Sequence, residues 1–360
     1  MKTRRIAVLA GDGIGPEVIA EGIRVLRAAQ QLLPGDGYEL EEFSVGAGEF
    51  LRSGDPLPPQ TLARAGECDA VLLGAMGLPE VRRPNGVEMA PQLDLREHFD
   101  LYAGVRPIFL FHPDDSPLKP EKAGAIDLVI VRESTEGLFS ARKGTSSPAD
   151  PEARDTMRIT RRTSERLFRA AFRLAASRRK HVTLVDKANV LPSMAYFRAI
   201  FDEVAREFPE IATDRVYVDA AALYLVERPH SFDVLVTENM FGDILSDLAA
   251  GLVGGMGMAP SADIGDSFAV FQPSHGSAPS IAGRGLANPV ATILSVAMML
   301  DWFQEPERAA AIRGAVRWVF RDRGMRTAEM GGRLGTRAMA DAVLDAMALT
   351  TQPTKRGESL

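Results

Sequence analysis

Short apolar runs alternate with longer amphipathic segments along this chain, and this alternation constrains its fold more than any other feature. The run Ala70–Gly74 contains no polar residue, which is typical of a strand that is buried on both faces of a sheet. Strands that alternate with helices predict an α/β fold. The predicted strands are Arg5–Ala10, Tyr38–Val45, Ala70–Gly74, Ile126–Arg132, Met157–Arg161, His181–Val185, Val216–Val218 and Val234–Thr237, and the predicted helices are Pro16–Leu33, Ser164–Ser177, Met194–Phe208 and Ala287–Phe303.

Composition and charge exclude several classes of protein. Of the 360 residues, 46% are hydrophobic and 25% are charged, as in ordinary soluble globular proteins. The net charge of −6, without a basic stripe, argues against nucleic acid as the main partner. No apolar stretch approaches the roughly 20 residues of a membrane span, and the first apolar run is too short for a signal peptide. The single cysteine, Cys68, fits a reducing compartment, so we expect a cytoplasmic protein without a membrane partner.

No linker divides the chain into two successive domains. Two lobes between which the chain crosses more than once fit the pattern of predicted elements better than two domains in series. The polar stretch Lys143–Asp155 interrupts this pattern, and we expect it to be a connector or an arm that projects from the body.

A glycine-rich turn, Gly11–Gly15, follows the first predicted strand and opens the first predicted helix. This context invites comparison with the dinucleotide-binding fingerprint G-x-G-x-x-G, but the spacing here is G-x-G-x-G, followed by Pro16 at the first helical position. The glycines are therefore expected to form a tight turn rather than a standard phosphate-binding loop.

The segment Thr237–Leu248 carries a regular polar pattern. On a helix, Asn239, Asp243 and Asp247 recur every fourth residue and share one face, while the remaining positions are largely apolar. Like charges at this spacing destabilise a helix unless something neutralises them. A bound hard divalent cation and a solvated acidic face are both compatible with this pattern.

Arginine and lysine residues supply further candidate site residues. Arg96, Arg106 and Arg132 stand at or near the ends of predicted elements, beside apolar residues. Their guanidinium groups suit bidentate recognition of carboxylates, although single arginines of this kind usually form surface ion pairs. Lys187 follows a predicted strand, where sites of α/β proteins form, and could transfer a proton if its pKa were depressed. Taken alone, a surface lysine is the better interpretation.

The segment Gln272–Pro289 is dense in small residues and prolines and contains His275 and Asn288. So many backbone constraints favour a shaped loop that closes on something flat or phosphorylated over a plain surface loop.

Together these segments resemble the β-decarboxylating dehydrogenase family, which comprises isopropylmalate, isocitrate, homoisocitrate and tartrate/D-malate dehydrogenases. The resemblance runs in order from residue 5 to about residue 345. Its motifs are GDGIGPEV (Gly11–Val18), LLGAMG (Leu72–Gly77), LDLREHFDLYAGVRP (Leu93–Pro107), VRESTEG (Val131–Gly137), DKANVLPS (Asp186–Ser193), VDAAALYLV (Val218–Val226), TENMFGDILSD (Thr237–Asp247), PSA (Pro260–Ala262) and HGSAPSIAGRGLANP (His275–Pro289).

The resemblance implies an isopropylmalate-dehydrogenase-like fold, with two lobes and a mixed sheet flanked by helices, and not a standard Rossmann domain. Residues 1–99 plus 252–360 would form the cofactor-side lobe. Residues 100–251 would form the lobe for substrate, metal and dimerisation, with an arm near 140–162.

The resemblance also implies roles for individual residues. NAD and Mg²⁺ or Mn²⁺ would be the cofactors, and a homodimer would share its active sites because Lys187 and Asp219 come from the partner subunit. Arg96, Arg106 and Arg132 would bind the substrate carboxylates, and Gln92 and Leu93 its variable substituent; Lys187 and Asp219 would be catalytic; Asp219, Asp243 and Asp247 would hold the metal; and His275, Gly276, Ser277, Ala278, Ser280, Ile281 and Asn288 would bind NAD.

Three positions depart from the family's pattern. Phe139 stands where relatives usually have tyrosine. Ser280 stands where NAD-preferring members often carry aspartate, and Gln92–Leu93 where the isopropylmalate enzymes have paired leucines. These departures leave open whether CO₂ is released, how strictly NAD is preferred and which diacid is the substrate.

The resemblance implies NAD- and metal-dependent oxidation of a malate-type 2-hydroxy diacid such as D-malate, tartrate or 3-isopropylmalate, with or without decarboxylation. One alternative is a non-catalytic regulatory paralogue, which the missing hydroxyl at Phe139 favours slightly and the retained arginines, lysine and aspartates oppose. A second alternative is an unrelated phosphate-binding α/β protein.

Overall fold

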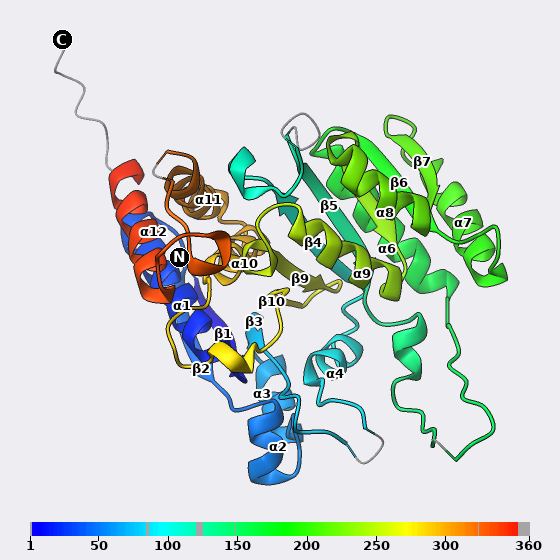
Figure 1. Ribbon diagram of the computed structural model, residues 1–360, viewed down its shortest axis with the longest axis horizontal. Coiled ribbons are helices and arrows are strands. Elements are labelled where there is room, and N and C mark those ends of the chain that lie inside the picture. The colour runs from blue at the N-terminus through cyan, green and yellow to red at the C-terminus, as the bar shows by residue number, and fades with distance from the viewer. Residues whose placement is uncertain (1, 84–85, 120–124, 148, 323, 352–360) are drawn as a thin grey trace.

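One ten-stranded sheet runs through the part of the chain that the computed structural model describes, residues 2–83, 86–119, 125–147, 149–322 and 324–351 (Figure 1). The strand order is β2-β1-β3-β10-β9-β4-β5-β8-β6-β7. The strands are β1 (Thr3–Gly11), β2 (Gly37–Glu42), β3 (Ala70–Ala75), β4 (Ala103–Phe109), β5 (Asp127–Glu133), β6 (His181–Asp186), β7 (Ala212–Tyr217), β8 (Val234–Thr237), β9 (Pro260–Ile264) and β10 (Ala269–Pro273).

The sheet is mixed, with an antiparallel centre between two parallel halves. Strands β2, β1, β3 and β10 pair in parallel, as do β5, β8, β6 and β7. The pairs β10–β9, β9–β4 and β4–β5 are antiparallel. This arrangement confirms the predicted mixed sheet and differs from a standard Rossmann domain, whose sheet is mostly parallel.

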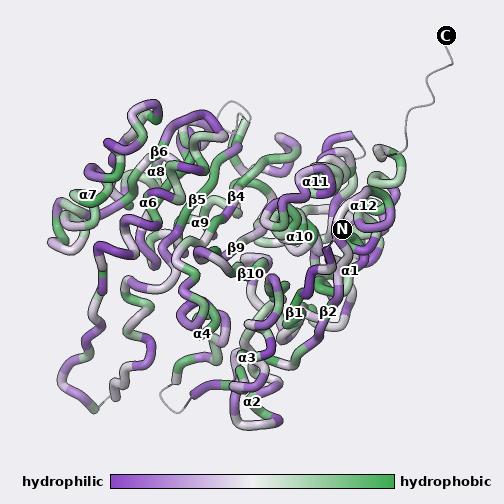
Figure 2. The backbone as a smooth tube through the Cα atoms, turned by 180° about the vertical axis from the view of Figure 1, so that it is seen from behind, coloured by the Kyte–Doolittle hydropathy of each residue, from purple (hydrophilic) through white to green (hydrophobic). Residues whose placement is uncertain are grey.

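Helices cover both faces of the sheet (Figure 1). One face packs against α1 (Gly15–Leu32), α6 (Arg161–Ala176), α7 (Pro192–Ala205), α10 (Val290–Trp302), α11 (Pro306–Arg321) and α12 (Thr336–Thr351). The other packs against α3 (Pro59–Gly66), α4 (Pro91–His98), α8 (Val218–Glu227) and α9 (Asn239–Gly251). The short helix α2 (Ala47–Ser53) follows β2. Figure 2 shows hydrophobic residues along the central strands.

The alternation of side chains along β5 decides where the site residues point. Val129 and Val131 pack towards α6 and α7, whereas Leu128 and Ile130 pack towards α8 and α9. Arg132 continues the second series and therefore faces α9. Arg106 lies opposite Ile130 in the β4–β5 ladder, so it emerges on the same face.

The hydrophobic clusters draw on two sets of residues. Two of them combine residues between 6 and 101 with residues between 258 and 347, and two others use only residues between 102 and 253. The sheet nevertheless continues from one set into the other. The lobe boundaries given above stay a prediction.

Two sequence-based expectations about strands are wrong. Met157–Arg161 is not a strand, because Arg158 makes only an isolated bridge to Gly137 and Thr160 caps α6 by accepting a hydrogen bond from the Thr163 amide. Val218 does not end a strand: β7 stops at Tyr217 and Val218 opens α8. In both cases a helix start overrides local β-propensity.

The chain between the short 3₁₀ helix η2 (Leu138–Ala141) and α6 runs out from the body of the molecule and back (Figure 1). This excursion includes the polar stretch for which an arm or connector is expected. Among the described helices, none is long and apolar enough to span a bilayer.

Candidate active site

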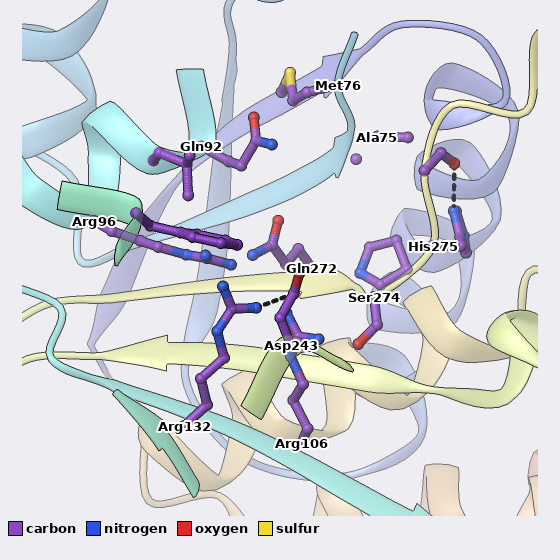
Figure 3. Close-up of a pocket in the computed structure, with 15 residues that line it drawn as sticks. Ala75, Met76, Gln92, Arg96, Arg106, Arg132, Asp243, Gln272, Ser274 and His275 are labelled. Atoms are coloured by element: carbon purple, nitrogen blue, oxygen red, sulfur yellow. Dashed lines mark hydrogen bonds and ion pairs between the residues drawn. The ribbon is translucent and has the colours of Figure 1, made fainter. Parts of the chain in front are cut away.

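Three arginines from three elements meet at the wall of one pocket (Figure 3). Arg96 lies in the last turn of α4, Arg106 in the middle of β4 and Arg132 near the end of β5. Arg106 was expected at or near the end of an element. It lies instead in the middle of a strand, because β4 continues to Phe109. The pocket has a volume of about 210 Å³ and is lined by Gly74, Ala75, Met76, Gln92, Leu93, Arg96, Arg106, Arg132, Phe139, Asp243, Gln272, Pro273, Ser274, His275 and Gly276.

Acidic and polar side chains hold the buried arginines. Arg132 is 1% exposed, donates to the Asn239 side-chain oxygen at 2.6 and 2.9 Å, and pairs with Asp243. Arg106 lies 3.6 Å from a carboxylate oxygen of Asp243 and equally far from one of Asp247.

Arg96 pairs with an aspartate that the sequence patterns do not predict. The Arg96 Nε atom lies 2.9 Å from a carboxylate oxygen of Asp263, which is buried on β9 and also accepts a hydrogen bond from Gln272. A lone aspartate in a short buried strand is the available signal, since a buried carboxylate needs a cationic or donor partner.

The pocket gathers positive charge. Burial lowers the pKa of Arg132 to about 9, and the like charges of Arg106 and Arg96 add to this shift. The pKa of Arg106 is lowered in the same way, first by burial and then by Arg96. An anion that bonds to these guanidinium groups would offset the repulsion between their like charges, as Asp243 already does in part, so the pocket favours an anionic ligand.

Asn239, Asp243 and Asp247 all lie on helix α9, as the sequence predicts, but their surroundings differ. Asn239 is buried between Arg132 and the Glu136 carbonyl oxygen. The side chains of Asp243 and Asp247 are 40% and 57% exposed. Burial nevertheless raises the pKa of Asp247.

Lys187 and Asp219 contact each other and do not line the arginine pocket. Lys187 directly follows β6, as predicted, and Asp219 is in the first turn of α8. The Lys187 Nζ and an Asp219 carboxylate oxygen are 2.5 Å apart, and this contact lowers the pKa of Asp219. Neither residue lines the pocket.

The carboxylates of α9 fit a hard divalent cation in donor type but not in number. Such a cation takes six or more oxygen ligands. Within the described residues, no group of three His, Cys, Asp or Glu side chains is arranged to hold a metal ion. Asp243 and Asp247 therefore supply only part of the ligands that such a cation needs, and Asp219 of the same chain is not placed to supply another.

The glycine-rich turn contacts a neighbouring loop. The Ile14 amide donates to the Ser277 carbonyl oxygen at 2.8 Å. A Cβ atom on Gly13, whose φ is +57°, would lie 2.0 Å from that same oxygen. The glycines thus form a tight turn that lets the loop approach, as their spacing predicts.

The loop after β10 holds the residues expected to bind NAD in several environments. His275 and Gly276 line the arginine pocket, and burial lowers the pKa of His275. Ser277 is buried and its hydroxyl donates to the Gly77 carbonyl oxygen at 2.5 Å. Ala278 has a left-handed backbone with φ +38°, and Ser280 and Ile281 follow in the 3₁₀ helix η5 (Pro279–Ile281).

Asn288, also expected to contact NAD, is 2% exposed. Its side-chain oxygen accepts from the Val290 amide at the start of α10, and its NH₂ group lies against the sulfur atoms of Met258 and Met330. The side chain is therefore directed towards the body of the protein.

Gln92 and Phe139 face the arginines. The Gln92 side-chain oxygen is buried and, among the described residues, has no hydrogen-bond donor. The Phe139 ring centre lies 5.1 Å from the Arg132 guanidinium carbon. Two of the three departures from the family's pattern, Gln92 and Phe139, therefore line the pocket itself.

The fold and this pocket define an α/β protein with a cluster of buried arginines in one pocket near the centre of its sheet. The family model described as isocitrate/isopropylmalate dehydrogenase matches residues 5–343. The chain belongs to this family and is a dehydrogenase. The alternative of an unrelated phosphate-binding protein is wrong.

Individual relatives agree with this assignment. The 3-isopropylmalate dehydrogenase of Moorella thermoacetica is 47% identical over 336 residues, which cover 91% of this chain and 93% of that protein. The enzyme of the same name from Anaeromyxobacter dehalogenans is 45% identical over 96% of this chain and 99% of its own. The crystal structure of isocitrate dehydrogenase from Methylococcus capsulatus superposes with a TM-score of 0.86 at 37% identity, over 96% of this chain and 99% of that chain.

Proposed function

We propose that this dehydrogenase oxidises a malate-type 2-hydroxy diacid with NAD and Mg²⁺ or Mn²⁺. The observation that carries the proposal is the cluster of Arg96, Arg106 and Arg132 in one pocket. Three guanidinium groups suit two carboxylates, because each planar fork can donate two parallel hydrogen bonds to a carboxylate.

The proposed chemistry divides between the bound groups and the protein. When bound, NAD accepts the hydride from the carbinol carbon and the divalent cation stabilises the alkoxide. The three arginines orient the diacid, Asp243 and Asp247 supply oxygen ligands to the cation, and the Nζ of Lys187 takes the proton of the hydroxyl. Asp219 neighbours Lys187 and would add a further oxygen ligand.

We further propose a homodimer with shared active sites, because Lys187 and Asp219 do not line the arginine pocket of their own chain. A second copy would bring them to Asp243 and Asp247. Exposed apolar side chains near these residues support such an interface, since soluble monomers rarely expose many of them together. They are Val190, Tyr196, Tyr217, Leu223, Val226 and Ile244.

The loop residues His275, Gly276, Ser277, Ala278, Ser280, Ile281 and Asn288 remain the proposed NAD-binding segment. Within it, Ser280 supplies neither a carboxylate for the ribose diol nor a cation for a 2′-phosphate. Arg284 lies near, donating to the Ser280 carbonyl oxygen at 3.3 Å. We therefore propose a preference for NAD that is weaker than in members with aspartate at this position.

The metal requirement gives a first prediction. Asp243→Asn should remove most metal-dependent turnover, because it deletes one anionic ligand, and EDTA should do the same to the wild type. NADH formation with added Mn²⁺ measures both effects. Asp202→Asn, which removes a carboxylate from an exposed ion pair with Arg215, is the control and should stay active. Full activity of Asp243→Asn, or of the wild type in EDTA, contradicts the proposed metal role.

Gln92 gives a prediction about the substrate. Its side-chain oxygen, which has no donor within the described part of the chain, favours a small or polar substituent, as in D-malate or tartrate, because an apolar one would leave it unsatisfied at a cost of roughly 1–3 kcal/mol. Leu93 and the names of the relatives favour 3-isopropylmalate instead.

A comparison of kcat/KM for D-malate, tartrate, isocitrate and 3-isopropylmalate decides whether the site prefers a small or polar substituent or the isopropyl group. We expect D-malate or tartrate to lead, and Gln92→Leu to shift the ratio towards 3-isopropylmalate by roughly tenfold or more. A wild-type kcat/KM for 3-isopropylmalate well above the others shows that Gln92 does not exclude the isopropyl group.

Ser280 gives a prediction about the coenzyme. The wild type should have a higher kcat/KM with NAD than with NADP, and Ser280→Asp should widen this ratio because a carboxylate would bind the ribose diol and repel the 2′-phosphate. Equal or better turnover with NADP refutes the preference. A ratio unchanged by Ser280→Asp would mean that the residue does not contact the ribose.

Phe139 gives a prediction about CO₂. The tyrosine expected at this position in relatives would protonate the enolate carbon after CO₂ loss, and such proton donation is typically worth about 10²–10⁴-fold in rate. Phenylalanine carries no such proton, so oxidation should survive, but an enolate that is not protonated can recapture CO₂ and leave the oxidised keto acid as the product. We expect fewer CO₂ than NADH per turnover, and Phe139→Tyr should raise the ratio. A ratio near one that Phe139→Tyr leaves unchanged would show that the hydroxyl is irrelevant here.

A further inference from the structure

The loop that contains η5 packs against the first turn of α1. Side chains of both parts form one small apolar cluster, in which Ile14 and Val18 of the α1 end contact Ala278, Ile281, Ala282 and Ala287 of the loop. The backbone bond from the Ile14 amide to the Ser277 carbonyl oxygen fixes the start of this contact at 2.8 Å. The position of the loop therefore depends on residues that are about 260 positions away in sequence.

Glu17, in the first turn of α1, bonds to the middle of the loop. One carboxylate oxygen accepts from the Gly283 amide at 2.8 Å and the other from the Gly285 amide at 3.1 Å. Both glycines have left-handed backbones, with φ +71° and +62°. An ionised carboxylate has two acceptor oxygens and no donor, so it matches two converging N–H groups.

The opposite side of the loop is fixed by the start of α12. The Thr336 amide donates to the Gly285 carbonyl oxygen at 2.8 Å, and the Thr336 hydroxyl donates to the Ala287 carbonyl oxygen at 2.6 Å. The exposed turn around Arg284 is thus held from two helices, and Glu17 is the side chain that bonds to both left-handed glycines.

We propose that Glu17 is a positioning residue for coenzyme binding, which it promotes by holding the Gly283–Gly285 turn so that Ser280 and Ile281 keep one arrangement. This inference rests on the proposed function of the loop in binding NAD. A loop that is already ordered loses less conformational freedom when a ligand binds, so affinity rises without a direct contact. Glu17 would then influence NAD and leave the arginine pocket unaffected.

A purely structural role for Glu17 has a different signature. An acidic residue in the first turn of a helix stabilises that helix by its charge alone. Loss of that effect would lower the stability of the whole protein, whereas loss of positioning would loosen one turn and weaken the binding of one ligand.

The experiment uses Glu17→Gln in the full chain. The amide keeps one acceptor oxygen but turns an NH₂ group towards one glycine amide, so one bond is lost. Arg284 provides a local probe, because trypsin cleaves after it only when the exposed turn opens, giving fragments 1–284 and 285–360. We expect faster cleavage at Arg284, a KM for NAD raised by roughly tenfold, unchanged kcat and diacid KM, and a Tm lowered by no more than the loss of one helix-end charge causes.

Two further variants sharpen the comparison. Glu39→Gln removes the same charge from an exposed position on β2 and should match the wild type in every measurement. Gly283→Ala should reproduce Glu17→Gln, because an added Cβ meets no atom within 4 Å and the variant is strained only by its φ of +71°.

Each outcome has a definite meaning. Wild-type cleavage of Glu17→Gln at Arg284 overturns the positioning role, whatever the kinetics. A lowered Tm with cleavage at many sites supports the structural role and overturns the proposal. Faster cleavage at Arg284 with an unchanged KM for NAD, and no protection of the wild type by NAD, overturns the assignment of the loop to the coenzyme.

Discussion

The contact of Arg132 with α9 is the interaction on which the rest of the site depends. This guanidinium is 1% exposed at the end of β5, and an unpaired charge at such a position would cost several kcal/mol. Asn239 and Asp243 offset that cost from one turn of α9. A Cβ atom on Gly242 would lie 2.7 Å from the Cβ and Cγ of Arg132, so only glycine lets the helix approach the strand so closely.

Much of the fold follows from local patterns, but the centre of the sheet does not. Several parallel strands were predictable because they are runs of apolar residues, such as Ala70–Ala75, whereas the mostly polar β7 was predicted only over its last two residues. Strands β4, β9 and β10, which form antiparallel pairs at the centre, escaped prediction because each contains a proline, and β4 also contains Gly104. Their pairing depends on strands far away in sequence, which no local pattern records.

The sequence predicted which residues belong to the site better than it predicted which of them contact one another. Periodicity placed Asp243 and Asp247 on one helix face, and the resemblance supplied the arginines. Neither revealed that Asp263 pairs with Arg96 or that the Gly13 turn contacts Ser277, because both contacts join segments about 170 to 260 residues apart. The resemblance also implied that Lys187 comes from the partner subunit, and its absence from the pocket lining of its own chain supports the proposed shared site.

Asp243 has two alternative partners, which are Arg132 in this structure and the proposed divalent cation. The carboxylate that pairs with Arg132 should compete with a substrate carboxylate for the same guanidinium when no metal is present. Calorimetric titration with the best diacid of the substrate panel, in EDTA, tests this directly on the wild type and Asp243→Asn. The account predicts that Asp243→Asn binds the diacid more tightly, by roughly tenfold, because Arg132 is no longer neutralised. Equal or weaker binding by Asp243→Asn would contradict it.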